Sequence, residues 1–296
     1  MKNFIKYIGS LILIIIALLY LLELLYTHTY KNGNPRNKVA YVLSMNDKYI
    51  DYIFLGSSRV DNNIDTEVIE KITGKKALNL GIQGAKLDDY FLMLQLLIKQ
   101  NIKSETVFIQ VDYVYNMDGT SDILKSYLMP YMKDDLIASY IKERDPDFYK
   151  LKYIPFYKYL VYDYKLGFRE HFSTFINKKS RINLENGYDA KYGSTGSKLQ
   201  ASLPISINKD SKTIMAINKF AEENKIKVVY FMAPFCFDTK NKDFSQKLKQ
   251  KIPGLLDYTQ LFKEDNYFFN CSHLNDIGAK EFSKTIAMDI LRQEIN

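Results

Sequence analysis

A serine pair and a late histidine are the residues of this chain that could form a nucleophilic site. Ser57 and Ser58 follow Gly56 in the stretch FLGSSRV, at the point where an apolar run ends. Serine is a weak nucleophile at its own pKa, so it needs a neighbouring base that is itself oriented by a third group. His273 is the candidate base, and Asn270, three residues earlier, could hold its ring.

Each of these residues also has a structural interpretation. Ser57 and Ser58 could simply cap the helix that follows them. Gly84, in NLGIQGA, could be a turn glycine, and His273 could be an ordinary loop histidine. The nucleophile-elbow pattern G-x-S-x-G is not met, because Val60 stands where its second glycine should be.

Arg59 and the two cysteines leave further alternatives open. Arg59 could bind an anion or a carboxylate near the site, or it could form a structural salt bridge. Cys236 and Cys271 are too few for a disulfide-stapled fold and wrongly spaced for a zinc site. A bridge between them could form in an oxidising compartment, although we expect two free thiols. Cys271 is a weak rival nucleophile because it shares a short loop with His273.

The elements around these residues alternate between strands and helices. Strands are expected at Tyr52–Leu55, Ala77–Leu80 and ETVFIQV, with helices in DNNIDTEVIEKITG and KLDDYFLMLQLLIKQN. The pattern resumes with the helix SKTIMAINKFAEENK, the strand KVVYFMAP, a last short strand NYFFN, and a final helix capped by Asn275 or Asp276. This alternation indicates right-handed βαβ units and a parallel sheet. Strand ends converge on one edge of such a sheet, so the candidate residues could meet there.

The alternation stops between residues 115 and 205. This segment is rich in tyrosine and is expected to be mostly helical, with a loop-like last third. It follows the end of a strand, where open α/β sheets place their ligand crevices. It could therefore cap a site, offer a surface to a membrane partner, or only add packing.

Residues 1–30 predict a transmembrane signal anchor. The apolar stretch from about residue 8 to 26 approaches the roughly 20 residues that cross a bilayer, and no small-x-small cleavage site follows it. Glu23 lies near one end of the stretch, where it could reach the interface. We expect one span, with residues 31–296 on one side of the membrane.

The overall composition suits one large domain, or one domain with a sizeable insertion. The chain has 296 residues, 47% of them hydrophobic, and a net charge of +7 that is spread thinly. No dense basic block or nucleic-acid motif is present, so we expect no nucleic-acid partner. A mildly basic surface would suit an anionic membrane or envelope polymer, or it could be a plain lysine-rich solvated surface. No metal or cofactor site is expected.

Three motifs together resemble the SGNH, or GDSL-like, hydrolase superfamily: FLGSSRV, NLGIQGA and NCSHLNDIGAKEFS. The resemblance implies that Ser58 is the nucleophile, that His273 is the base and that Gly84 is an oxyanion donor. Asn270 stands where the family has an aspartate. The family also has a Gly-x-Asn-Asp block between the second and the last of these motifs. This chain lacks that signature, and Asn116 is a displaced candidate for its asparagine.

The resemblance also implies a fold and a function. The expected fold is a three-layer α/β/α, flavodoxin-like parallel sheet over residues 31–296, with a helical insertion and a preceding transmembrane helix. The HLN-x-x-G continuation is similar to membrane-anchored proteins of cell-envelope polysaccharide O-acylation, such as the teichoic-acid D-alanylation and alginate-acetylation types. We therefore expect a single-pass serine esterase or O-acyltransferase whose catalytic domain is extracytoplasmic. Its substrate would be a carbohydrate, and its partner a multi-span membrane acyltransferase.

A catalytically inactive SGNH-like domain is the alternative. Such a domain would bind polysaccharide or act as a scaffold for the membrane enzyme. Asn270 keeps this alternative open, because a neutral amide can orient an imidazole but cannot stabilise its cation by charge. The missing Gly-x-Asn-Asp signature also keeps this alternative open.

Overall fold

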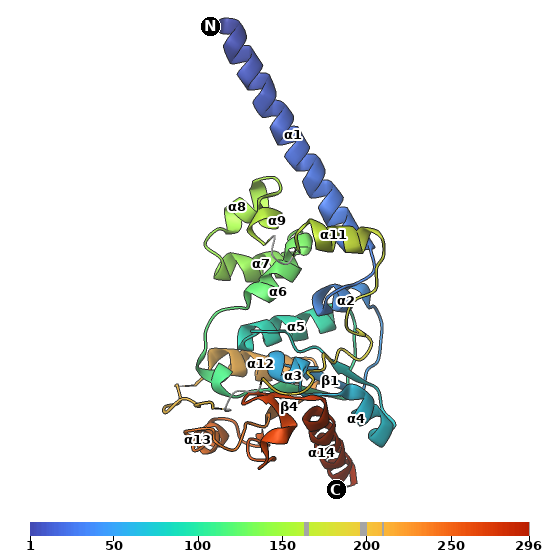
Figure 1. Cartoon of the computed structure of the whole chain (residues 1–296), viewed down its shortest axis with the longest axis vertical. Helices are drawn as coiled ribbons and strands as arrows, with labels where there is room; N and C mark the ends of the chain where they lie inside the picture. The colour runs from blue at the N-terminus through green and yellow to red at the C-terminus, as the bar shows by residue number, and fades with distance from the viewer. Residues whose placement is uncertain (163–165, 196–199, 209, 296) are drawn as a thin grey trace. The chain divides into compact units, whose positions relative to one another are not determined.

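The protein is described by a computed structural model that covers residues 1–162, 166–195, 200–208 and 210–295 (Figure 1). The parts of the expected insertion at 163–165 and 196–199 lie outside the described residues. The chain divides into two compact units. The helical unit comprises Met1–Tyr41 and Lys125–Ser180, and the sheet unit comprises Val42–Leu124 and Arg181–Asn296. The loop-like end of the expected insertion, after residue 180, therefore belongs to the sheet unit.

A five-stranded parallel sheet forms the centre of the sheet unit. Its strands are β1 (Tyr52–Leu55), β2 (Ala77–Asn79), β3 (Thr106–Gln110), β4 (Lys227–Met232) and β5 (Leu256–Asp257). Their order is β2-β1-β3-β4-β5, and all neighbours are parallel. This is the flavodoxin-like order, and it confirms the expected α/β fold class.

Helices cover both faces of this sheet (Figure 1). Helices α4 (Thr66–Thr73) and α14 (Asp276–Ile295) pack against each other on one face, and α5 (Leu87–Lys99) and α12 (Lys212–Glu223) pack together on the other. Strands β1, β2 and β3 are buried along their whole length, because both faces of a parallel sheet are covered. This explains their nearly continuous apolar sequences.

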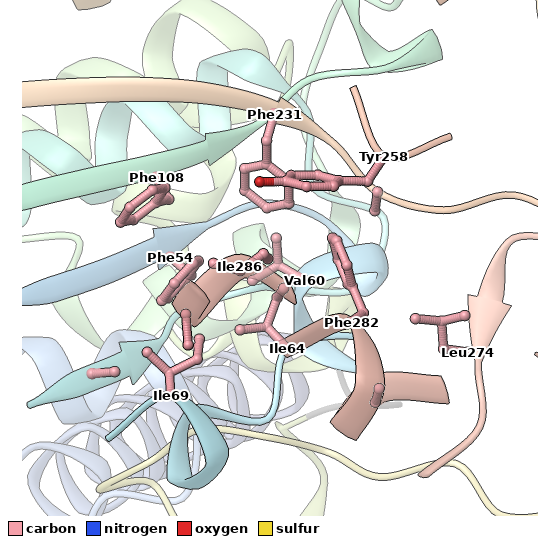
Figure 2. Close-up of a cluster of buried hydrophobic side chains, with 14 of the residues drawn as sticks. Phe54, Val60, Ile64, Ile69, Phe108, Phe231, Tyr258, Leu274, Phe282 and Ile286 are labelled. Carbon is pink, nitrogen blue, oxygen red and sulfur yellow. The ribbon is translucent and has the colours of Figure 1, made fainter. Parts of the chain in front are cut away.

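The core beneath α4 and α14 reaches the candidate site residues. Figure 2 shows Phe54, Phe108 and Phe231 of the sheet facing Ile69, Phe282 and Ile286 of these helices. Val60 and Leu274 belong to the same cluster and are fully buried. Each is a close neighbour in sequence of a candidate catalytic residue.

The expected last strand, NYFFN, lies outside the parallel sheet. Strand β6 (Phe268–Asn270) pairs antiparallel with β7 (His273–Leu274) in a separate two-stranded sheet. The fifth position in the main sheet is taken by β5, which has only two residues and so offers no alternation to detect. The sequence suggested that His273 follows a strand of the parallel sheet. It follows β6 instead, which lies outside that sheet.

The remaining elements are shorter, except for the first helix. The sheet unit also contains α3 (Ser58–Asp61), η1 (Tyr113–Asn116), α13 (Phe244–Lys251) and η3 (Asp265–Tyr267). The helical unit contains α1 (Lys2–Asn32), η2 (Met129–Tyr131), α7 (Asp135–Arg144), α8 (Phe148–Tyr153), α9 (Tyr157–Val161) and α11 (Phe168–Phe175). Helices α2 (Lys38–Ser44) and α6 (Asp122–Leu128) span the boundaries between the units. By length and composition, α1 could cross a membrane.

Cys236 and Cys271 form a disulfide, so the expectation of two free thiols is wrong. Their Cα atoms are 4.7 Å apart, and the Cys236 N–H donates a hydrogen bond to the Cys271 carbonyl at 3.0 Å. Both residues lie in loops separated by 35 positions, and the sequence alone gives no sign that these loops meet. Cys271 therefore has no thiol that could compete as a nucleophile.

Candidate active site

Ser58 is the first residue of α3, in the serine turn (residues 56–58) that follows β1. This turn lies at the carboxyl end of β1, beside the point between β1 and β3 where open sheets bind ligands. Ser57 has the structural role: its Oγ accepts the Arg59 N–H at 3.3 Å, and its own N–H and hydroxyl donate to Gln110 Oε1 at 3.0 Å. Of the two serines, Ser58 is the one that faces the histidine.

His273 lies against Ser58 in the histidine turn (residues 270–273). Its Nε2 is 2.7 Å from Ser58 Oγ, and its Nδ1 is 2.9 Å from Asn270 Oδ1. The same Asn270 oxygen accepts the backbone N–H groups of Ser272 at 3.1 Å and of His273 at 3.0 Å. These donors fix the orientation of the amide, so the Nδ1 atom must carry the ring proton. The Nε2 lone pair is then available to accept the Ser58 hydroxyl proton.

The surroundings of His273 make it a weak base. Burial lowers its pKa to about 4, and the positive charges of Arg59 and Lys191 act in the same direction. The ring is therefore neutral at pH 7, as a base must be. Asn270 has no charge to stabilise the imidazolium that proton transfer would form. The geometry of the pair suits catalysis better than its electrostatics do.

A buried chain of polar groups connects the serine turn to the histidine turn. Gln110 Nε2 donates to Asp112 Oδ2 at 2.6 Å, and the same oxygen is 2.6 Å from Arg59 Nε. Arg59 Nη1 in turn donates to the Ser272 carbonyl at 2.7 Å. Burial raises the pKa of Asp112, and the Arg59 charge opposes this effect. This series of polar contacts runs from the cap of α3 to Ser272, the residue before the base.

Arg59 is therefore a structural residue and not an exposed anion-binding group. Its Nη2 donates to the carbonyls of Ala233 at 2.7 Å and Pro234 at 3.0 Å, and its guanidinium lies 3.6 Å from the centre of the Phe235 ring. Its side chain and that of Asp112 have no solvent exposure. Of the two roles that the sequence left open, the salt bridge is correct.

The core and the disulfide also hold the two turns. Val60 and Leu274 pack in the same buried cluster, two residues after Ser58 and one residue after His273, respectively. The Leu274 N–H donates to Asn63 Oδ1 at 2.9 Å. The disulfide fixes the histidine turn from its other end.

Gly84 lies in the loop between β2 and α5, in a conformation that suits glycine. Its φ is +69°, a left-handed value that side chains other than glycine seldom adopt. Ser121 Oγ lies beside it and donates to the Gln83 carbonyl at 2.8 Å, which holds the loop. The role of the Gly84 N–H as an oxyanion donor stays a prediction.

Asn116 does not join the Ser58–His273 pair. Its Nδ2 donates to the Ser206 carbonyl at 2.8 Å, and its Oδ1 accepts the Asn208 N–H at 2.9 Å. Both ends of the amide contact this surface segment, and the role of Asn116 as an oxyanion donor stays a prediction.

Sequence reasoning missed three polar residues around the pair: Gln110, Asn63 and Lys191. Gln110 carried a usable signal, because a polar residue inside the apolar run VFIQV must find a partner when it is buried. Asn63 and Lys191 carried none, since their contacts come from distant segments. The Lys191 carbonyl accepts the Asp276 N–H at 2.7 Å, next to the start of α14.

Comparisons with known proteins give limited information on this site. No family model and no curated protein matches the chain. One similar solved structure, from Desulfitobacterium hafniense DCB-2, is assigned to the G-D-S-L family of lipolytic proteins. The two sequences are 14% identical, the match covers 82% of this chain and 99% of that chain, and the TM-score is 0.40. The fold class of this chain rests on its own strand order, and its chemistry on the Ser58–His273–Asn270 geometry.

Proposed function

We propose that this protein is a membrane-anchored serine esterase or O-acyltransferase of the SGNH type, acting on acylated cell-envelope or extracellular polysaccharide. The observation that carries the proposal is the 2.7 Å contact between Ser58 Oγ and His273 Nε2. Asn270 fixes the tautomer in which Nε2 can accept a proton. A serine, a neutral base and an orienting group are the parts that acyl transfer needs.

The proposed reaction has two matching halves. Ser58 Oγ attacks the carbonyl carbon of an acyl ester while its proton passes to His273 Nε2. The tetrahedral intermediate then breaks the ester C–O bond, and His273 returns the proton to the departing alcohol. A sugar hydroxyl or water attacks the resulting acyl-Ser58 ester, again losing its proton to His273, which gives it back to Ser58 Oγ.

The oxyanion would be held by backbone amides. The Ser58 N–H is the first amide of α3 and has no acceptor within the helix. The Gly84 N–H is the second proposed donor. In acyl-transfer enzymes the loss of one such donor costs about 2.7–4 kcal/mol of transition-state stabilisation, so each of the two proposed amides would contribute a stabilisation of about that size.

Other features support the proposed location and substrate. The Cys236–Cys271 disulfide is typical of an oxidising, extracytoplasmic compartment. The apolar helix α1 would keep the catalytic unit close to a membrane acyl donor, such as a multi-span acyltransferase. The HLN-x-x-G resemblance favours a polysaccharide hydroxyl as the acyl acceptor.

A fluorophosphonate probe, which labels activated serines, tests the proposal. We expect the probe to label the full-length protein and the Ser57→Ala variant, but not Ser58→Ala. Ser57 is the matched control because it is the neighbouring serine and is bound to Gln110 instead of His273. Circular dichroism would establish that each variant is folded.

Absence of labelling in the folded protein would overturn the enzymatic proposal. Asn270 would then favour the second candidate, an inactive domain that binds polysaccharide or acts as a scaffold for a membrane acyltransferase. Labelling of Ser58→Ala would likewise exclude Ser58 as the nucleophile.

A further inference from the structure

The helical unit carries exposed apolar side chains on short helices that pack beside α1. We define the apolar rim as Tyr153, Leu160, Val161, Phe168, Phe172 and Phe175, whose exposed fractions lie between 46% and 71%. We infer that this rim lies in the headgroup region of a lipid bilayer, at the level where α1 leaves the hydrocarbon core. This inference goes beyond the proposed acyl chemistry and does not depend on it.

Helix α11 has one face on α1 and one face without cover. The His171 ring stacks on Tyr26 of α1 at 3.8 Å, and Thr174, on the same side, is buried. Phe168, Phe172 and Phe175 follow the i, i+4, i+7 spacing of a single helix face and are 50–71% exposed. Three phenylalanines on one exposed face are a patch of the kind that marks an interaction site.

Helix α9 is attached to α1 through a carboxylate that is unusual in an apolar helix. Glu23 accepts a hydrogen bond from the Phe156 N–H at 2.7 Å and forms an ion pair with Lys158 at 2.7 Å. Glu23 is therefore neutralised by the helical unit itself. Leu160 and Val161, at the end of α9, remain exposed.

The length of α1 sets the level of these contacts. Lys2 and Glu23 are 21 positions apart, which at about 1.5 Å per residue corresponds to roughly 30 Å along the helix, the thickness of a hydrocarbon core. If Lys2 lies at one boundary of the hydrocarbon core, Glu23 lies at the other boundary. Helix α9 meets α1 at Glu23, and α11 meets it at Tyr26 and Thr29, one to two turns further out. That is the depth of the lipid headgroups.

The chemistry of this segment fits a lipid interface. Helices that lie in the interface carry Phe and Leu on their apolar face, and tyrosine is enriched at the boundary between hydrocarbon and water. Phe, Leu and Tyr make up all of the rim except Val161. Residues 148–180 contain seven basic and two acidic residues, a balance that favours anionic headgroups. Apolar and basic groups on one short segment, next to an apolar helix, are what an interfacial segment requires.

The absence of tryptophan from the chain allows a direct test. Full-length Phe172→Trp and Leu160→Trp would each be reconstituted in vesicles of phosphatidylcholine and phosphatidylglycerol. The phosphatidylcholine would be brominated either near the headgroup or near the end of the acyl chain. Leu13→Trp is the matched control, because Leu13 is a similarly exposed apolar residue (68%) in the middle of α1.

We expect both rim tryptophans to emit at shorter wavelength than N-acetyltryptophanamide and to lose most of their emission to the shallow bromines. Leu13→Trp should be quenched more strongly by the deep bromines. Rim tryptophans that emit like the free amide and escape both quenchers would overturn the inference, since the rim would then face water or require a protein partner. If Leu13→Trp also escapes quenching, α1 does not enter the bilayer and the inference is wrong.

Discussion

The serine turn and the histidine turn bring their reactive groups to one point by different means. The serine turn follows a central strand of the parallel sheet, and its position comes from β1, its neighbour β3 and the cap formed by Ser57 and Gln110. The histidine turn belongs to a two-residue antiparallel pairing outside that sheet. A disulfide, the Arg59 guanidinium and the Asn63 amide hold it.

This difference shows where each half of the pair is vulnerable. The sheet is a cooperative element with a large core, so the position of Ser58 follows from the fold itself. The position of His273 depends on the packing of one neighbour, Leu274, and on a few individual bonds from side chains. Changes to these bonds should therefore affect the base before they affect the nucleophile.

The strongest test of the comparison asks whether the two turns form one functional unit. We expect Ser58→Ala and His273→Ala each to lower the turnover of an aryl ester by about 10⁴-fold or more, because each removes the same proton-transfer step. The double variant should lose no more than either single variant. If the two losses multiply instead, the residues act independently and the 2.7 Å contact has no catalytic meaning.

Arg59→Met would test the buried connection between the turns. The substitution leaves the Asp112 carboxylate buried without its ionic partner. We expect the free energy of unfolding to fall by about 3–5 kcal/mol, the usual cost of breaking a buried ion pair. Urea unfolding would measure it. Lys284→Ala removes an exposed ion pair to Glu281 and is the control, with an expected cost below about 1 kcal/mol. Equal costs for the two variants would mean that the buried chain contributes no more than a surface pair.

Replacing both cysteines tests whether the histidine turn depends on its crosslink. Cys236→Ser with Cys271→Ser removes a link across 35 positions, for which chain entropy gives about 3–4 kcal/mol of stability. The folded fraction should also react more slowly with a fluorophosphonate, because His273 is held less firmly. An unchanged labelling rate would show that hydrogen bonds alone position the base.

Asn270→Asp sharpens the comparison at the base itself. The added carboxylate should raise the pKa of His273 from about 4 and increase turnover by about 10-fold or more, because it stabilises the imidazolium. Since the base must be neutral, kcat/KM of the unaltered enzyme should fall only as the pH drops through about 4, and that limb should move to higher pH in the variant. Asn270→Ala, which removes the ring's acceptor, should lower turnover. An unchanged acid limb in Asn270→Asp would mean that another group controls it.

The sequence allowed good prediction of the sheet unit and poorer prediction of what surrounds the histidine. Strand β1 was expected at Tyr52–Leu55, where the structure has it, because an apolar run bounded by glycine is a strong signal. Strand β5 was missed because two residues carry no period. Ser58, His273 and Asn270 were selected together from their order in the chain, and the structure places them in contact.

The errors concern contacts between distant segments. The disulfide and the burial of Arg59 both depend on how the loop after β4 approaches the histidine turn. No local pattern encodes such approaches.

The burial of Val60 and Leu274 has a consequence for how this site tolerates change. Both side chains pack in the core cluster that contains Phe282. The nucleophile and the base are therefore held by the same group of buried side chains. A substitution that repacks this core would reach both turns, so a single apolar change can alter the separation of the reacting atoms. The volume of this shared core therefore limits the apolar sequences that keep the nucleophile and the base aligned.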